Sequence, residues 1–275
     1  MYELFSYFKK MNLLEFKSNY RSQYGEDGII EKIFEIIGGP KNKYFVEFGA
    51  WDGEFLSNTF NLYKNHNWSG CYIEGDKKKF KELKYRYENI NQIESICAFV
   101  ESGRNKNSLS ELLKKSKTPK NFDLLSIDID GNDYNVWKDF KDYDPTLVII
   151  EYNQTIPYNI EYIDHEGESY IGSSCLSLFK LAKQKGYELI CCTESNCLFI
   201  KKEFYHLFNI EDNTPFKLQI RKECYVILNH SGEVVFSDED FFPNKIKRII
   251  YQRIKKRIKH SLFGKKSFFF LKNNR

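Results

Sequence analysis

F-V-E-F-G-A-W-D-G-E-F-L-S-N-T, residues 45–59, places an acid near the end of a short apolar run and a glycine directly after that run. The run 44–48 is of the type found in buried parallel strands. Gly49 permits a tight turn and a close approach of the backbone to a ligand. The segment therefore predicts a buried strand followed by a cofactor loop, with Glu47, Gly49 and Gly53 as its ligand-binding residues.

The spacing of this loop indicates which cofactor it binds. It reads E-x-G-x-x-x-G, whereas dinucleotide-binding loops read G-x-G-x-x-G, so an NAD-dependent oxidoreductase is disfavoured. A second acid, Glu74, ends the apolar run 70–74, where an acid can accept hydrogen bonds from both ribose hydroxyls. The alternative for Glu74 is a solvent-facing acid ahead of the lysines at 77–79. Taken together, the two acids favour S-adenosylmethionine.

Strands and helices are expected to alternate along residues 24–201. Apolar runs predict seven strands, at 44–48, 70–74, 96–100, 123–128, 146–151, 187–192 and 197–201. Helical spacing predicts helices at 24–37, 54–65, 77–87, 109–115, 133–140 and 174–185. This alternation predicts an α/β fold with a Rossmann-like, doubly wound and mostly parallel seven-stranded sheet, closed by an antiparallel edge strand.

Charge is distributed unevenly along the 275 residues. Residues 243–275 hold twelve Lys and Arg and no acids, so the first 242 residues carry 30 basic against 38 acidic side chains. We therefore expect an N-terminal extension over 1–21, a catalytic domain over 22–242 and a basic C-terminal tail over 243–275. The seven cysteines include no C-x-x-C pair, which favours reduced buried thiols over a disulfide framework or a zinc site.

The basic tail has apolar residues every three or four positions, at 246, 249, 250, 254, 258 and 262, as in an amphipathic helix. It either packs on the domain or on a second subunit of a homo-oligomer, or lies on anionic lipid as a peripheral anchor. Nucleic acid is disfavoured because the rest of the chain is acidic and no recognition module is present. No apolar run reaches the roughly 18 residues of a membrane span and no signal peptide is seen, so we expect a cytoplasmic protein, at the inner face of the membrane if the tail is an anchor.

Four blocks in the order found here resemble FkbM-related class I methyltransferases. They are S-Q-Y-G-E-D-G-I-I-E-K-I-F (22–34), the Glu47 loop, D-L-L-S-I-D-I-D-G-N-D-Y-N-V-W (123–137) and V-I-I-E-Y-N-Q-T-I-P (148–157). The resemblance covers about residues 20–202 and implies S-adenosylmethionine-dependent methyl transfer, with many members acting on sugars and other bacterial small molecules. It also implies that Ser22 and Gln23 lie near the cofactor.

Polar side chains follow the two strands 123–128 and 146–151, at the sheet edge where ligands bind in doubly wound folds. Asp128 and Asp130 follow the first strand, and we assign both to catalysis and Asp128 also to cofactor binding. A hydroxyl acceptor needs a base or a metal ion to take its proton. Asp128, Glu151 and Asn153 offer the oxygen ligands that Mg²⁺ prefers, in a placement that resembles metal-assisted O-methyltransferases but with Tyr152 inserted.

His165, in the polar loop I-D-H-E-G-E-S-Y-I-G-S-S (163–174), is the best histidine for a general base; the alternative is an exposed loop histidine. Tyr170 and Ser173 would line the same pocket. We therefore expect an O-methyltransferase for a small polar acceptor: a sugar, a nucleotide sugar or a surface-glycan precursor. The alternatives are a nucleotide-linked acceptor methylated at an oxygen on phosphorus, and a non-catalytic scaffold that docks through its basic tail.

Overall fold

The computed structural model describes residues 11–165 and 172–220, together with 226–228, 230, 234–236 and 269–270. The chain divides into two compact units, Met1–Ile220 and Arg221–Arg275. The first unit therefore ends earlier than the boundary at 242 expected from charge. It also begins earlier than residue 22, because Leu13 in the 3-10 helix η1 (Leu13–Phe16) is buried in its core.

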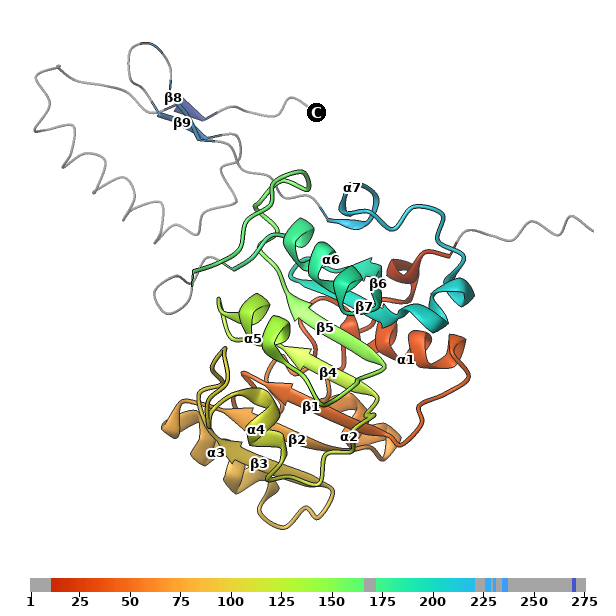
Figure 1. Ribbon diagram of the computed structural model, residues 1–275, viewed down its shortest axis with the longest axis vertical. Coiled ribbons are helices and arrows are strands. Elements are labelled where there is room, and N and C mark those ends of the chain that lie inside the picture. The colour runs from red at the N-terminus through yellow and green to blue at the C-terminus, as the bar shows by residue number, and fades with distance from the viewer. Residues whose placement is uncertain are drawn as a thin grey trace, which may run out of the picture. The chain divides into compact units, whose positions relative to one another are not determined.

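The first unit is built on one seven-stranded sheet, which confirms the predicted fold class (Figure 1). The strand order is β3-β2-β1-β4-β5-β7-β6, and only β7 runs antiparallel to its neighbours. This order reverses direction between β1 and β4, which places a ligand crevice at the carboxyl ends of the strands there. The strands are β1 (Tyr44–Phe48), β2 (Ser69–Glu74), β3 (Ile93–Cys97), β4 (Leu124–Ile127), β5 (Leu147–Glu151), β6 (Tyr187–Cys192) and β7 (Asn196–Lys201).

Helices cover both faces of the sheet. One face packs against α4, α5 and α6, and the other against α1, α2 and α3. Strand β1 shows why the sequence requires both layers: all five of its residues are buried, and alternate side chains enter opposite cores. The helices are α1 (Glu26–Ile36), α2 (Phe60–His66), α3 (Lys77–Tyr87), α4 (Leu109–Leu113), α5 (Asp133–Asp139), α6 (Cys175–Gln184) and α7 (Pro215–Leu218), and a second 3-10 helix, η2, spans Lys202–Phe208.

Two predicted elements are displaced. The second helix begins at Phe60 instead of residue 54, because Ser57, Asn58 and Thr59 bind the Glu47 carboxylate and form an irregular loop. The third strand is Ile93–Cys97 instead of 96–100. Residues 98–100 line a cavity beyond the end of that strand. They are apolar for that reason, and their composition resembles that of a buried strand.

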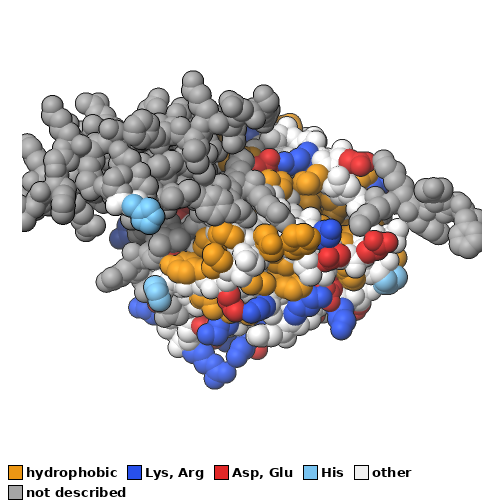
Figure 2. Space-filling view, turned by 90° about the horizontal axis from the view of Figure 1, so that it is seen from above, with side chains coloured by type: hydrophobic (Ala, Val, Ile, Leu, Met, Phe, Trp, Pro, Cys, Tyr) orange, Lys and Arg blue, Asp and Glu red, His pale blue; other side chains and the backbone are white. Residues whose placement is uncertain are grey.

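Hydrophobic side chains also reach the surface of the described part. Figure 2 shows them gathered on one face, with Lys and Arg side chains mainly along its lower margin. The exposed large hydrophobic residues include Trp51, Phe55, Leu56 and Phe99. No helix among the described residues is long and apolar enough to span a membrane.

The second unit contains a three-stranded sheet of order β10-β9-β8. Its strands are β8 (Val226–Leu228), β9 (Val234–Phe236) and β10 (Phe269–Phe270). β8 pairs antiparallel with β9, and β10 pairs parallel with β9. The amphipathic helix predicted over 246–262 lies outside the described residues, and its role stays a prediction.

Candidate active site

A cavity of about 560 Å³ opens at the carboxyl ends of β1 to β5. Seven of the residues predicted to form the site line it, and they come from five different loops and strand ends. These are Gln23, Glu47, Gly49, Glu74, Asp128, Asp130 and Glu151. Six of them end or follow a strand at the same edge of the parallel sheet, and Gln23 joins them from the segment before α1.

The cofactor half of the cavity combines a glycine turn with a buried acid. Gly49 has φ +78°, a conformation that residues with a β-carbon rarely adopt. Glu74 is buried, and its two oxygens accept hydrogen bonds from the backbone N–H groups of Trp51, at 2.8 Å, and Asp76, at 2.6 Å. These two bonds fix the Glu74 carboxylate at the cavity wall, and each oxygen keeps a lone pair for a ligand hydroxyl.

Glu47 organises the loop that follows it. One carboxylate oxygen accepts from the Asn58 N–H at 3.1 Å, and the other accepts from the hydroxyls of Ser57, at 2.7 Å, and Thr59. Burial raises the pKa of Glu47 above its ordinary value, and these hydrogen bonds counter that rise. Glu47 lines the cavity, but most of its hydrogen-bonding capacity holds residues 57–59 in place.

Asp27, in the N-terminal block 22–34, holds the turn that places Gln23 at the cavity. One Asp27 oxygen accepts from the backbone N–H groups of Tyr20, Arg21 and Ser22, at 2.7 to 2.9 Å, and from the Ser22 hydroxyl at 2.8 Å. Ser22 is therefore buried in the turn and does not line the cavity, whereas the exposed Gln23 does. The resemblance pointed to both residues, and the structure gives Ser22 a positioning role.

Three carboxylates meet on the acceptor side. Asp128, Asp130 and Glu151 each bring an oxygen within 4.8 Å of the others. Burial raises the pKa of Asp128 to about 8, and the neighbouring carboxylates of Asp133 and Asp130 contribute further. Burial, followed by the charge of Asp128, raises the pKa of Glu151 to about 9. At neutral pH both carboxyls of the Asp128–Glu151 pair therefore hold a proton, and the first is lost as pH rises through about 8.

The loop that carries these acids is held from below by Asp133. Its carboxylate accepts from the backbone N–H groups of Ile129 and Gly131, both at 2.9 Å. Asp130 sits at the top of this loop with φ +58° and an exposed side chain. A non-glycine residue in this left-handed conformation costs energy, and the Asp133 hydrogen bonds stabilise it.

Asp130 lies beside Asp128 and Glu151, although the sequence predicted Asn153 as the third metal ligand. The Asn153 side-chain oxygen accepts from the N–H and hydroxyl of Thr155, at 2.9 and 2.6 Å, and Asn153 does not line the cavity. Three carboxylates are suitable ligands for a hard divalent cation such as Mg²⁺.

Three other predicted residues do not line the cavity. Gly53 packs on α3, where a β-carbon would lie 2.6 Å from the Tyr87 ring. His165 is exposed. Ser173 is buried, and its hydroxyl accepts from the Asp164 N–H at 3.0 Å. Tyr170 lies outside the described residues.

Asp164 fastens the start of the predicted acceptor loop to its end. Its carboxylate accepts from the N–H of His165 at 3.0 Å and from the N–H of Gly172 at 2.9 Å. Asp164 is itself buried. The two ends of segment 166–171 are thereby held together at the base.

The aromatic side chains around the cavity were not identified from sequence. Trp51, Phe55 and Phe99 line it and are all exposed, Phe99 by 69%. The Lys79 ammonium lies 4.0 Å from the centre of the Trp51 ring, within cation–π distance. Phe55 and Phe99 fall within the helix predicted over 54–65 and the strand predicted over 96–100, and Trp51 lies in the predicted cofactor loop, so no sequence signal marked them as cavity residues.

Residues 98–189 match the family model described as the methyltransferase FkbM domain. This segment runs from the end of β3 into β6, and contains all three acids of the carboxylate group. The expected resemblance to FkbM-related methyltransferases is confirmed, and the match supports methyl transfer as the activity. No curated protein matches the chain in sequence.

Solved structures with a similar fold are remote in sequence. The N-terminal domain of EvdMO1 with SAH bound is 14% identical, with 64% of this chain and 79% of that chain covered and a TM-score of 0.40. A putative caffeoyl-CoA O-methyltransferase from Staphylococcus aureus is 15% identical over 63% and 81%, with a TM-score of 0.41. Monomeric WbdD is 16% identical over 66% and 42%, with a TM-score of 0.42. The fold assignment rests on the strand order of the chain itself.

Proposed function

We propose that this chain is an S-adenosylmethionine-dependent O-methyltransferase that acts on a hydroxyl of a small polar acceptor, of the sugar, nucleotide-sugar or glycan-precursor class. One observation carries the proposal. A single cavity holds both the glycine turn with Glu74 and the carboxylate group of Asp128, Asp130 and Glu151. The proposed cofactor site and the proposed proton-accepting site therefore share one cavity.

The cofactor half fits S-adenosylmethionine. Glu74 is placed to accept from the ribose hydroxyls, and the turn at Gly49 leaves backbone close to the ligand because no side chain intervenes. Gln23 and Glu47 lie on the same wall and are suited to the polar methionine end. When bound, the cofactor supplies an electrophilic methyl group on a sulfonium.

The acceptor half removes the hydroxyl proton. The Asp128–Glu151 pair loses its first proton as pH rises through about 8, and the carboxylate so formed is the base. Its raised pKa, near 8 to 9, makes it a stronger base than an ordinary carboxylate. The cavity otherwise aligns the acceptor oxygen with the methyl group, which is the main requirement of an in-line transfer.

The other side chains that line the cavity are suited to a polar acceptor that contains a ring. Acidic oxygens can accept from several hydroxyls, while Trp51, Phe55 and Phe99 offer apolar faces for packing. The same carboxylates would hold Mg²⁺ if a metal lowers the pKa of the acceptor hydroxyl instead. Chelation distinguishes the two routes, since a carboxylate base keeps its activity in excess EDTA.

Titration calorimetry of the full chain with S-adenosylhomocysteine, with and without Mg²⁺, tests the cofactor half. We expect one saturable site that Glu74→Gln weakens about tenfold or more, because a charged acceptor is lost. Glu188→Gln is the matched control: Glu188 is equally buried but binds Lys183 and Asn213 away from the cavity. No binding by folded protein would favour the scaffold alternative.

Methyl transfer to a panel of sugars and nucleotide sugars, followed by mass spectrometry, tests the acceptor half. Asp128→Asn should retain cofactor binding and lose most of the transfer. Methylation at phosphate oxygen in that panel would instead establish the nucleotide-linked alternative. Transfer that survives Asp128→Asn at full rate would remove the carboxylate pair from the mechanism.

A further inference from the structure

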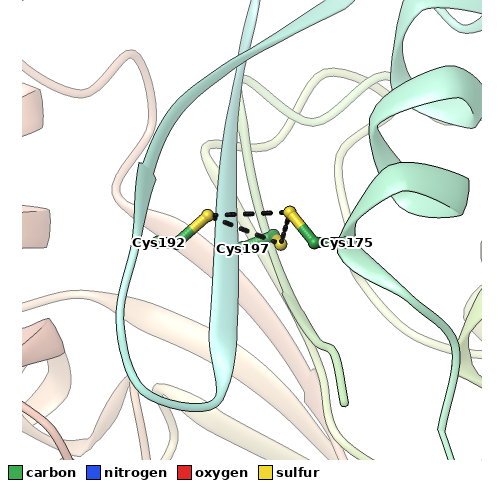
Figure 3. A group of neighbouring side chains, drawn as sticks. All are labelled: Cys175, Cys192 and Cys197. Atoms are coloured by element: carbon green, nitrogen blue, oxygen red, sulfur yellow. Dashed lines mark hydrogen bonds between the residues drawn. The ribbon is translucent and has the colours of Figure 1, made fainter. Parts of the chain in front are cut away.

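Three buried thiols converge beside the sheet, away from the cavity (Figure 3). Cys175 is the first residue of α6, Cys192 ends β6 and Cys197 lies in β7. Their sulfurs are 3.9 Å (175 to 192), 3.8 Å (192 to 197) and 3.5 Å (175 to 197) apart. All three side chains are at most 1% exposed.

The fold, and not local spacing, creates this cluster. Cys192 and Cys197 are opposite each other in the antiparallel pairing of β6 with β7. The helix α6 packs on the same face of the sheet and adds Cys175 to the same core. The adjacent Cys191 is also buried, but it belongs to the core on the opposite face. Of the four neighbouring cysteines, only these three therefore share one face of the sheet.

The sulfur triangle has the dimensions of a metal–thiolate site. With sides of 3.5, 3.8 and 3.9 Å, its centre lies about 2.2 Å from each sulfur, close to the metal–thiolate bond of about 2.3 Å. We propose that Cys175, Cys192 and Cys197 bind one soft, thiophilic metal ion, Cu(I), in three-coordinate geometry.

The number of ligands selects the metal. Structural zinc is almost always four-coordinate, and among the described residues no further His, Cys, Asp or Glu joins this group. The hydroxyl of Tyr152, in the same core, already donates to the Thr193 carbonyl at 3.0 Å. Soft thiolates without oxygen or nitrogen ligands favour Cu(I), and an apolar surrounding excludes water as a fourth ligand.

Hydrogen bonding links the thiols of the cluster. The Cys197 thiol donates to the Cys175 sulfur. Cys175 also lies at the N-terminus of α6, where the backbone stabilises a thiolate. Binding of Cu(I) would form three sulfur–copper bonds and release one proton from each thiol, with no change of oxidation state.

A bound copper ion would tie the first turn of α6 to the β6–β7 hairpin. That turn directly follows Ser173 and Ser174, whose backbone and hydroxyls bond to residues 153, 162 and 164 on the acceptor side. The site would thus stabilise the support of the acceptor loop without entering the reaction.

Anaerobic titration of the full chain with Cu(I), against a chromophoric Cu(I) chelator, tests the proposal. The background variant Cys97→Ser removes the one thiol that is exposed among the described residues. We expect one tightly bound equivalent and near-ultraviolet thiolate-to-copper absorption, both lost in Cys175→Ala, Cys192→Ala and Cys197→Ala. Cys191→Ala, which removes an equally buried thiol on the opposite face, should keep both.

Equal copper uptake by all four variants would overturn the proposal, as would displacement of Cu(I) by an equal concentration of Zn²⁺. A thiol count in denaturant that reveals a disulfide within the trio would assign the cluster to redox pairing instead. Thermal unfolding of the Cys97→Ser protein needs none of the alanine variants, so it decides the case even if they misfold. Cu(I) should raise its Tm by about 5 °C or more, and an unchanged Tm would contradict a folded-state site.

Discussion

Gly49 and Asp128 are in backbone contact: a β-carbon added to Gly49 would lie 1.6 Å from the Asp128 carbonyl oxygen. The turn after β1 therefore crosses directly over the end of β4. Because Gly49 belongs to the proposed cofactor half and Asp128 to the acceptor half, this contact sets the distance between them.

Gly49→Ala should destabilise the protein by about 2–4 kcal/mol, or prevent folding, since it adds backbone strain and a clash with main chain. Gly103→Ala separates the two effects. Gly103 has φ +81°, but a β-carbon there would meet nothing within 4 Å, so only strain, about 1 kcal/mol, is expected. Urea denaturation measures both variants. Equal losses would show that the contact with Asp128 is unimportant.

Asp27→Asn should weaken S-adenosylhomocysteine binding about tenfold. One Asp27 oxygen accepts four hydrogen bonds from residues 20–22, and a neutral amide replaces a charged acceptor there. Gln23 would then no longer be held against the cavity. Glu35→Gln, an exposed position of the same helix, is the control for calorimetry. Unchanged affinity would separate this turn from cofactor binding.

Methyl transfer should rise with pH from about 7 to about 9. The base must be ionised, and burial with mutual repulsion places the pKa of Asp128 near 8 and that of Glu151 near 9. In Asp128→Asn the repulsion is gone, so the rising limb should move to lower pH while the maximum rate falls. Rate profiles at saturating cofactor measure this. If the rise in rate occurs at the same pH in Asp128→Asn as in the unmodified protein, the group that titrates there is not the carboxylate pair.

The same pair should make the protein less stable in alkali. Folding raises both pKa values, so the folded state binds more protons than the unfolded state between about pH 4 and 9. The stabilisation of the folded state by these bound protons is complete below about pH 4 and is lost as pH rises through 8 to 9. From pH 6 to pH 9 we expect the free energy of unfolding to fall by several kcal/mol, because each proton lost contributes about 1.4 kcal/mol per pH unit. Glu151→Gln should flatten this slope, whereas Glu82→Gln on the exposed side of α3 should not.

The sheet and most of the cavity could be predicted from the sequence because parallel strands collect their end residues at one edge. Glu74, Asp128 and Glu151 each end or follow an apolar run, so their positions followed from the fold class alone. The same logic does not say which way a loop side chain points. Gly53 lies in the predicted cofactor loop and His165 in the polar loop after β5, but the first packs on α3 and the second is exposed.

The cysteine cluster could not be predicted from spacing. Cys175 is 17 residues from Cys192 and 22 from Cys197, which matches no short metal-binding motif. Its members meet only because β7 enters the sheet between β5 and β6 and places Cys197 beneath α6. Spacing alone therefore favoured isolated thiols.

Asp164 has a consequence for how the acceptor range of such an enzyme can change. Since it bonds to both His165 and Gly172, the chain between them begins and ends at one fixed point next to β5 and α6. The entropic cost of a longer segment at such a point grows only slowly with its length. Sequences of different length and chemistry can therefore be grafted between these two residues while the sheet and the carboxylate pair stay as they are. Asp164 therefore makes the position between His165 and Gly172 a suitable one for inserting sequences of varied length.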